Sequence, residues 1–374
     1  MNSQAPEIRV IISGGGTGGH IFPALAIANA LKGMNSNNKI LFVGAQGRME
    51  MEKVPAAGYE IVGLNITGIK RSLSLSNLKV PFRLVSSLWK ARSIVRSFKP
   101  DVVIGVGGYA SGPVLFAASL MKVPTLIQEQ NSYAGVTNRI LGKKAQSICV
   151  AYENMERYFP AGKIHITGNP VRQDIEAGKV GRSEAAKHFG LNPDKKIVLA
   201  IGGSLGARTI NKSIAGGWQR MAESGVQVLW QTGKVFYSEA HEQERASAGM
   251  LKVLDFIPRM DMAYAAADII VSRAGASSLS ELAIVGKPVI LVPSPNVAED
   301  HQTKNAMALV EKNAAILVVD EKAKEELVLH VLDLIASDPD CERLSKEIKK
   351  MARTGADQKI ALEVYCLFEN KNKN

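Results

Sequence analysis

Short apolar runs alternate with longer amphipathic segments along nearly the whole sequence, and this alternation limits the possible folds more than any other feature. The runs are rich in β-branched residues and are bounded by turn residues, which is typical of buried strands. We expect strands at 9–13, 39–44, 101–107, 124–128, 147–151, 196–204, 226–232, 268–273, 288–293 and 314–319. Helices are expected at 21–33, 48–57, 81–99 and 111–121. Strand–helix alternation of this kind predicts an α/β protein with parallel sheets that are covered by helices on both faces.

The strand–helix alternation begins at two places in the chain. Two glycine-rich turns, GGGTGGH at 14–20 and GGSLGAR at 202–208, each follow the first strand of a series and lie 188 residues apart. The chain of 374 residues is long enough for two domains. We therefore expect two doubly wound domains, at 1–172 and 173–354, joined near 168–182, where turn residues are frequent and periodicity is weak.

The basic charge is confined to the first half. Residues 1–172 carry a net charge of +12 and residues 173–374 a net charge of −1, and residues 70–99 hold eight basic side chains and no acidic one. A surface of this kind suits an anionic partner, whether nucleic acid, an acidic membrane face or a phosphorylated substrate.

Apolar side chains interleave with these cations between 66 and 95. An ordinary amphipathic helix over a core explains part of the pattern, but the surplus of apolar residues near 72–80 predicts a membrane contact. The residues expected at this contact are Leu73, Leu75, Leu78, Phe82, Trp89, Lys70, Arg71, Lys79 and Arg83.

The number and spacing of the cysteines exclude two kinds of structural site. The three cysteines are far apart, and no CxxC pair or Cys/His cluster occurs. This pattern excludes a disulfide scaffold and a structural zinc site. The sequence also shows no carboxylate pair that suggests a bound metal, and we expect no metal and no cofactor. We also expect neither a signal peptide nor a transmembrane helix.

The turn GGGTGGH places five glycines between a strand and a helix. Such a backbone can approach a diphosphate closely and offers N–H groups at a helix N-terminus; the alternative is a tight turn without a ligand. The motif is neither the dinucleotide fingerprint nor a P-loop, and no acidic residue suited to a ribose ends the second strand, which disfavours an NAD-dependent dehydrogenase. His20 follows the glycines, where a neutral imidazole can take a proton from a hydroxyl, unless it is merely a surface or cap residue.

The second half carries a comparable turn. Ser204 offers a hydroxyl to a phosphate, and SRAGASSLSEL at 272–282 leads from a strand into a helix through small residues. Glu281 lies about one turn inside that helix, where it either accepts the hydroxyls of a ribose or belongs to a capping box. Further polar residues stand at strand ends or helix starts and together predict a cleft between the domains. They are Glu129, Gln130, Asn131, Arg172, Asp300, His301 and Gln302.

Seven motifs occur in one order: GGGTGGH, GVGGYASGP, QEQNSYAGVTN, GNPVR, GGSLGAR, SRAGASSLSE and DHQTKNA. This series resembles the lipid II-forming N-acetylglucosaminyltransferases of glycosyltransferase family 28, the MurG family, over about residues 8–365. The resemblance implies the GT-B fold, with two Rossmann-like domains facing a cleft and the sugar nucleotide mainly in the second. It also implies that a last helix, within 355–374, completes the first domain.

The resemblance further implies a reaction. GlcNAc would move from UDP-GlcNAc to the C4 hydroxyl of MurNAc-pentapeptide on undecaprenyl diphosphate (lipid I), giving lipid II for peptidoglycan, with inversion in a single displacement. The enzyme would be peripheral on the cytoplasmic side of the inner membrane, at an anionic lipid surface, with cell-wall synthesis or division proteins as further partners.

The resemblance assigns roles to individual residues. His20 would be the catalytic base, and Gly14, Gly15 and Gly16 would contact the acceptor diphosphate. The residues expected to bind UDP-GlcNAc are Thr17, Gly18, Gly19, Asn131, Arg172, Ser204, Ile257, Ala276, Ser277, Ser278, Leu279, Ser280, Glu281 and Gln302.

Two kinds of alternative stay open. A UDP-GlcNAc 2-epimerase or another glycolipid glycosyltransferase would use the same architecture, although an epimerase would not need the apolar, cationic surface. A nucleic-acid-binding protein would also explain the basic half, but aromatic residues make up only 6% of the chain and no RNP, KH or zinc pattern is present.

Overall fold

A computed structural model describes residues 5–66, 80–178, 180–203 and 206–373. The chain forms two compact units, one of Met1–Val171 with Thr354–Asn374 and the other of Arg172–Arg353. Several residues with predicted roles lie outside the described residues: Lys70, Arg71, Leu73, Leu75, Leu78, Lys79 and Ser204. The side chain of Phe82 is likewise outside the described part.

The first unit contains a seven-stranded sheet in the order β3-β2-β1-β4-β5-β6-β7, with every neighbouring pair parallel. The strands are β1 (Arg9–Ser13), β2 (Lys39–Ala45), β3 (Glu60–Leu64), β4 (Val102–Gly105), β5 (Thr125–Glu129), β6 (Ser147–Val150) and β7 (Ile164–Ile166). The strand order changes direction between β1 and β4, which is the point at which open parallel sheets bind ligands beyond the carboxyl ends of their strands.

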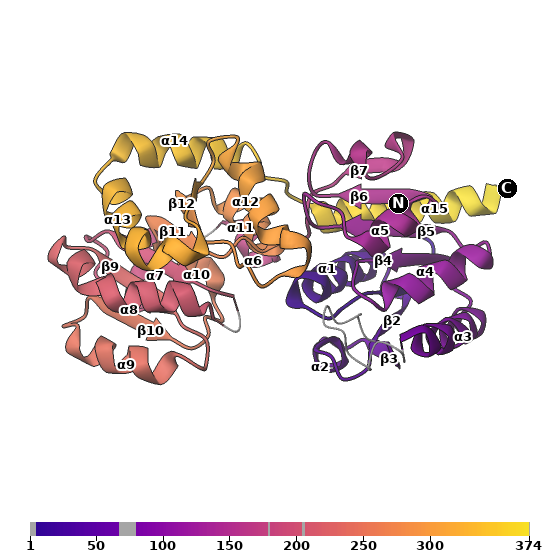
Figure 1. The fold of residues 1–374 in the computed structure, drawn as a ribbon. Helices are drawn as coiled ribbons and strands as arrows, with labels where there is room; N and C mark the ends of the chain where they lie inside the picture. Colours follow the sequence, from indigo (N-terminus) through magenta and orange to yellow (C-terminus); the bar gives the residue numbers. More distant parts are fainter. Residues whose placement is uncertain (1–4, 67–79, 179, 204–205, 374) are drawn as a thin grey trace. The chain divides into compact units, whose positions relative to one another are not determined.

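Helices cover both faces of this sheet (Figure 1). They are α1 (Gly18–Met34), α2 (Glu50–Ala56), α3 (Val80–Phe98), α4 (Ser111–Leu120), α5 (Val136–Gly142) and α15 (Ala356–Lys373), with short 3₁₀ turns η2 (Met155–Arg157) and η3 (Ala161–Lys163). Because side chains alternate along a strand, Val10 and Ile12 of β1 pack with α1, α2 and α15, whereas Ile11 packs with α3, α4 and α5. The last helix is tied to the start of the chain, since the Tyr365 hydroxyl donates to the Pro6 carbonyl at 3.1 Å.

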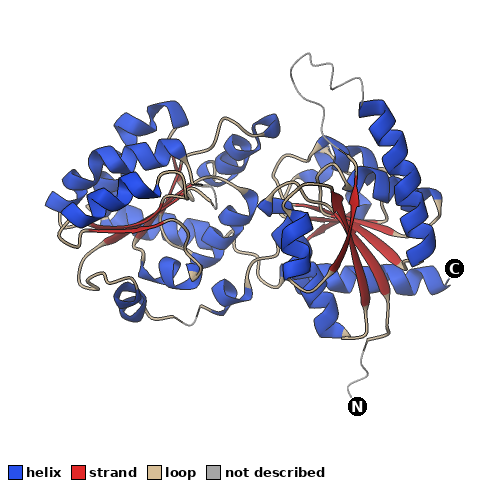
Figure 2. Ribbon diagram, turned by 90° about the horizontal axis from the view of Figure 1, so that it is seen from below, coloured by secondary structure: helices blue, strands red, loops and turns tan. Residues whose placement is uncertain are grey.

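The second unit contains a six-stranded parallel sheet in the order β10-β9-β8-β11-β12-β13. Its strands are β8 (Ile197–Ile201), β9 (Gln227–Gln231), β10 (Leu251–Leu254), β11 (Ile269–Ser272), β12 (Val289–Leu291) and β13 (Ile316–Leu317). Figure 2 shows strands between helices in each unit.

The helices of the second unit also lie on both faces of its sheet. They are α6 (Gln173–Ala177), α7 (Arg182–His188), α8 (Arg208–Glu223), α9 (Tyr237–Ala246), α10 (Met260–Ala266), α11 (Ala276–Val285), α12 (His301–Val310), α13 (Ala323–Ile335) and α14 (Asp338–Lys349), with 3₁₀ turns η4 (Ala298–Asp300) and η5 (Asp320–Lys322). The core of one face joins α8 and α13 to β8 and β9 around the buried Trp230, whose indole N–H donates to Asn211 at 3.0 Å.

The prediction of two parallel sheets with helices on both faces is confirmed. Three strands were not predicted, namely β3, β7 and β10, and each lies at the edge of its sheet. Edge strands are only partly covered, so their sequences carry polar residues such as Glu60, His165 and Lys252 and lack a continuous apolar run. The short helix α6 lies within the stretch that was expected to join the domains.

In the parts of the chain that the structure describes, no helix is both long enough and apolar enough to cross a membrane.

Candidate active site

The glycine-rich turn between β1 and α1 uses its first three N–H groups internally. These groups donate from Gly14 to the Val43 carbonyl at 3.3 Å, from Gly15 to the Gly107 carbonyl at 3.3 Å, and from Gly16 to the Glu50 carboxylate at 2.9 Å. The next three N–H groups, at 17–19, have no acceptor among the described residues. They lie at the N-terminus of a 17-residue helix, where the helix dipole favours a negative charge.

At two positions of this turn, Gly14 and Gly15, there is no room for a side chain. A Cβ on Gly14 would lie 2.2 Å from Val106 Cγ2, and one on Gly15 would lie 2.3 Å from the Glu50 carboxylate. Gly15 also has a φ of +145°, which other residues rarely adopt. The prediction that residues 14–16 contact the acceptor diphosphate stays a prediction, but their N–H groups are already engaged. The unsatisfied donors are those of residues 17–19.

Glu50 is the acidic residue that organises this turn, and the sequence reasoning missed it. Its side chain is in the first turn of α2 and the residue is 1% exposed. One carboxylate oxygen accepts the Gly16 N–H, and the other accepts the Ala45 N–H at 3.0 Å. An acidic residue at a helix start is so common that the sequence carries no signal for this role.

Replacing Glu50 by Ala is expected to lower the free energy of unfolding by about 2–4 kcal/mol, because the buried Ala45 N–H and the partly buried bond from the Gly16 N–H both lose a charged acceptor. Glu50→Gln keeps one acceptor oxygen and should lose less. The exposed neighbour Glu52 supplies the control, since Glu52→Ala should change stability by less than about 0.5 kcal/mol. Urea unfolding of the three variants measures these differences; equal stability of Glu50→Ala and Glu52→Ala would contradict the assignment.

His20 is held in one orientation by the same turn. Its Nδ1 lies 3.1 Å from the Gly15 carbonyl oxygen and 3.2 Å from Thr17 Oγ1. A carbonyl oxygen only accepts, so Nδ1 carries the proton, and in the neutral imidazole Nε2 then has the lone pair. Nε2 lies over Gly107, where a Cβ would be 2.8 Å away. This is the tautomer that a general base requires.

The loop after β5 is arranged around the buried carboxylate of Glu129. This carboxylate accepts four hydrogen bonds: from the Asn131 N–H at 3.0 Å, Asn131 Nδ2 at 3.1 Å, the Gly135 N–H at 3.1 Å and Asn138 Nδ2 at 2.9 Å. Glu129 therefore positions Asn131 and is not itself available to a ligand. In the described part of the chain, the buried Oε1 of Gln130 has no hydrogen-bond partner.

In the second unit, the N-terminus of α11 presents unsatisfied donors. The N–H groups of residues 276–278 have no acceptor within the described ranges, and the buried Ser277 hydroxyl has no partner there either. The Ser280 hydroxyl, in contrast, donates to the Ala276 carbonyl at 3.1 Å. Leu279 is 2% exposed and its N–H donates to the Gly275 carbonyl at 2.9 Å, so this predicted contact has neither an exposed side chain nor an open N–H group. Ser277 and the first turn thus have the donors that a diphosphate needs.

Glu281 and Arg172, which are 109 residues apart in sequence, form an ion pair with N–O distances of 3.3 and 3.4 Å. The Tyr264 hydroxyl donates to the same carboxylate at 2.9 Å. Burial raises the pKa of Glu281, while Arg172 and Tyr264 act in the opposite direction. Glu281 is the sixth residue of α11 and bonds to other elements, which argues against the capping-box alternative. Tyr264 was missed because the sequence around it looks like an ordinary core helix.

The remaining predicted donor contacts in this unit follow the carboxyl ends of its strands. Ile257, which follows β10, is fully buried and donates its N–H to Gln231 Oε1 at 3.3 Å. Gln302 of α12 accepts the Ser294 N–H at 2.9 Å and so fixes the loop after β12. With Ser277 and Glu281 after β11, these residues share the edge of the sheet at which open parallel sheets bind ligands.

Among the described residues, no group of three or more His, Cys, Asp or Glu is placed to hold a metal ion.

Two family models match the chain: the glycosyltransferase family 28 N-terminal domain over residues 10–150 and the family 28 C-terminal domain over residues 197–360. The chain belongs to glycosyltransferase family 28. The two family 28 matches contain the glycine turn with His20 in the first case and α11 with Glu281 in the second.

Relatives within family 28 are similar over their whole length. A protein of Cytophaga hutchinsonii is 57% identical over 100% of both chains, and one of Parabacteroides distasonis is 56% identical over 98% of this chain and 100% of its own. Both are named UDP-N-acetylglucosamine--N-acetylmuramyl-(pentapeptide) pyrophosphoryl-undecaprenol N-acetylglucosamine transferase.

Solved structures agree with the fold. The crystal structure of Acinetobacter baumannii MurG matches with a TM-score of 0.78 and 29% identity, covering 96% of this chain and 99% of that chain. A UDP-GlcNAc 2-epimerase from Neisseria meningitidis, bound to UDP-GlcNAc, matches with a TM-score of 0.65 and 16% identity over 96% of this chain and 100% of its own. At 16% identity, the similarity to the epimerase shows a shared fold only. The predicted GT-B architecture is thereby confirmed.

Proposed function

We propose that this protein transfers GlcNAc from UDP-GlcNAc to the C4 hydroxyl of MurNAc-pentapeptide-diphosphoryl-undecaprenol, forming lipid II for peptidoglycan. The observation that carries the proposal is the extent of similarity to relatives named for this reaction, which are 53–57% identical over at least 97% of this chain. A shared fold would not distinguish a transferase from an epimerase, but identity at this level over both domains does.

The donor is assigned to the second unit. The open N–H groups at the start of α11 and the Ser277 hydroxyl would hold the diphosphate, where the helix dipole stabilises the charge that develops on departing UDP. Glu281 would accept the ribose hydroxyls, while the backbone of Ile257 would contact the uracil. Gln302, and Asn131 of the first unit, would contact the sugar.

The chemical step is a single displacement. His20 Nε2 takes the proton of the acceptor C4 hydroxyl as its oxygen forms a bond to the anomeric carbon, and the bond from that carbon to the UDP oxygen breaks on the opposite side. Inversion follows from this geometry. The Gly15 carbonyl accepts from Nδ1 and holds the ring before and after proton transfer. The open N–H groups of residues 17–19 would bind anionic substrate oxygens, and Gly14–Gly16 shape the turn.

The first unit is assigned to an anionic membrane surface. On α3, Leu84, Val85 and Trp89 are 43%, 54% and 73% exposed. The neighbouring helices on the same sheet face also expose large apolar side chains, including Phe116, with Lys144 over its ring, and Ile140. Apolar side chains among cations suit insertion between anionic headgroups. The protein would thus be peripheral on the cytoplasmic side of the inner membrane; cell-wall or division proteins remain expected partners.

The double variant Leu84→Ser with Trp89→Ser is expected to bind anionic vesicles at least about tenfold more weakly, because two apolar side chains no longer insert. Co-sedimentation with phosphatidylglycerol-containing vesicles measures the change. Val235→Ser, at a strongly exposed apolar residue of the second unit, is the control and should bind normally. Unchanged sedimentation of the double variant would contradict the membrane assignment.

The proposed reaction is tested by UDP release from UDP-GlcNAc with and without a short-chain analogue of the lipid acceptor. Acceptor-dependent release, with a disaccharide-lipid product by mass spectrometry, is the expected result. Release of UDP with a free epimerised sugar in the absence of acceptor would instead identify an epimerase on the same architecture.

A further inference from the structure

A pocket lies in the second unit at the edge of the sheet opposite the proposed donor site. It has a volume of about 480 Å³ and is formed where β8, β11 and β12 begin, beneath α14. The proposed donor residues follow the carboxyl ends of strands of the same sheet, whereas this pocket is at the amino ends. Its lining residues are Lys196, Asp268, Ile269, Lys287, Pro288, Ile335, Cys341, Glu342, Ser345, Lys346 and Lys349.

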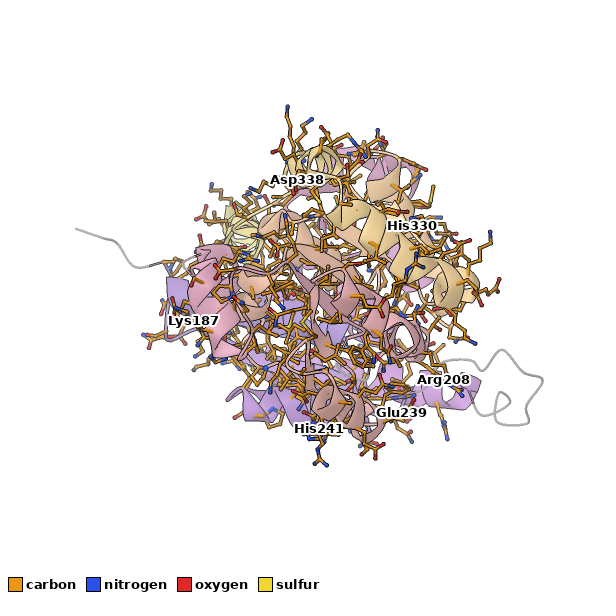
Figure 3. The ribbon with its side chains drawn as sticks, turned by 90° about the vertical axis from the view of Figure 1, so that its left-hand side faces the viewer. Lys187, Arg208, Glu239, His241, His330 and Asp338 are labelled. Atoms are coloured by element: carbon orange, nitrogen blue, oxygen red, sulfur yellow. The ribbon has the colours of Figure 1, made fainter. Side chains whose placement is uncertain are left out.

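Four of these residues are lysines and only two, Asp268 and Glu342, are acidic, so positive charge is in excess in the lining. Asp268 is already engaged, because it accepts from Arg182 Nη2 at 2.7 Å and from the Ile197 N–H at 2.8 Å. Lys196 is paired with Asp338 at 3.4 Å; Asp338 is labelled in Figure 3. For the ammonium groups of the other three lysines, the described residues offer no ion-pair or hydrogen-bond partner.

Two of the three unpaired lysines are brought together by a glycine. Gly286 ends α11 with a φ of +66°, and the side chain of Lys349 lies directly across it, so that a Cβ there would be 2.3 Å from Lys349 Cγ and Cε. Lys287 is the next residue and is partly buried. Its pKa is lowered by burial and by the nearby charges of Arg182 and Lys349, while Asp268 acts in the opposite direction. A bound anion would compensate this excess of positive charge.

The pocket also has an apolar part. Ile269, Pro288 and Ile335 line it together with the Cys341 side chain. The volume lies within the range of small-molecule sites, which combine apolar walls with a few charged groups. Three ammonium groups that have no partner among the described residues favour a ligand with several anionic oxygens, since lysine recognises phosphate as a point charge.

We propose that this pocket is a second anion site, which binds a small compound carrying two or more phosphate groups. This site is separate from the transfer reaction, since no residue assigned to the donor or the acceptor lines the pocket.

The test uses Cys341 as a reporter within the pocket and inorganic triphosphate as the probe. Cys366→Ser removes the exposed thiol, and Cys149 is fully buried with its pKa raised to about 12, so reagent modification reports on Cys341. We expect triphosphate to slow modification of Cys341 at least about tenfold. Binding at the donor site would leave this rate unchanged.

The pocket lysines are tested in the same background. Lys346→Ala with Lys349→Ala should raise the triphosphate concentration for half protection at least about tenfold. The control variant, Lys212→Ala with Lys324→Ala, removes the same charge from exposed positions elsewhere in the unit. It should change the triphosphate concentration for half protection by less than about twofold. Thermal unfolding verifies that all variants fold. The proposal is overturned if triphosphate does not protect Cys341, or if both double variants weaken protection equally.

Discussion

Replacing His20 by Ala is expected to lower kcat by about 10²–10⁴-fold, while the affinity for UDP-GlcNAc changes by less than about twofold. The reason is that Nε2 is the proton acceptor for the attacking hydroxyl, whereas the nucleotide contacts are assigned to α11 and its neighbours. The ring is fixed through Nδ1 by the Gly15 carbonyl, so the effect is a loss of the base and not of the turn. Steady-state UDP release and equilibrium binding of UDP-GlcNAc measure the two quantities separately.

His188 supplies a control for this experiment, because it lies in α7, outside the proposed sites. His188→Ala should leave kcat within about twofold of the original value. Unchanged turnover in His20→Ala would remove this residue from the mechanism. A parallel loss of donor affinity would instead mean that the substitution had disturbed the glycine turn.

Replacing Glu281 by Ala is expected to weaken UDP binding about a hundredfold, which corresponds to about 2.7 kcal/mol. The carboxylate is the assigned acceptor for two ribose hydroxyls, and hydrogen bonds to a charged group contribute about 1.5–3 kcal/mol each. Its loss also leaves Arg172 and Tyr264 without their shared partner. Isothermal titration with UDP measures the change, and Glu321→Ala, an exposed residue of the same unit, serves as the control.

The pH dependence of UDP binding gives a further readout of the same residue. The ionised form of Glu281 accepts the hydroxyls, and burial raises its pKa above the usual value of 4.5. UDP affinity should therefore be complete above that raised pKa and fall as the pH decreases through it. Glu281→Gln should bind more weakly but lose this acid-side decrease. An unchanged decrease in Glu281→Gln would assign it to another group.

Much of the fold was predictable because buried parallel strands carry continuous apolar runs. The ten predicted strands occur in the two sheets, with ends that differ by a few residues. The edge strands β3, β7 and β10 were missed because polar residues interrupt their apolar sequences, whereas the edge strand β13 lies in a continuous apolar run and was predicted. Local periodicity thus reports burial, and it fails where burial is incomplete.

By itself, the sequence determined the two α/β halves and the family, because these depend on apolar runs and on short motifs with local geometry; the ligand-binding segments stay a prediction from the same motifs. Only the tertiary structure revealed that Glu50 holds the glycine turn, that Glu129 positions Asn131, and that Tyr264 and Arg172 meet at Glu281. Buried carboxylates need several donors, and the fold supplies these from segments that are distant in sequence. No local pattern records which segments will meet, so the partners of each site residue were decided by packing.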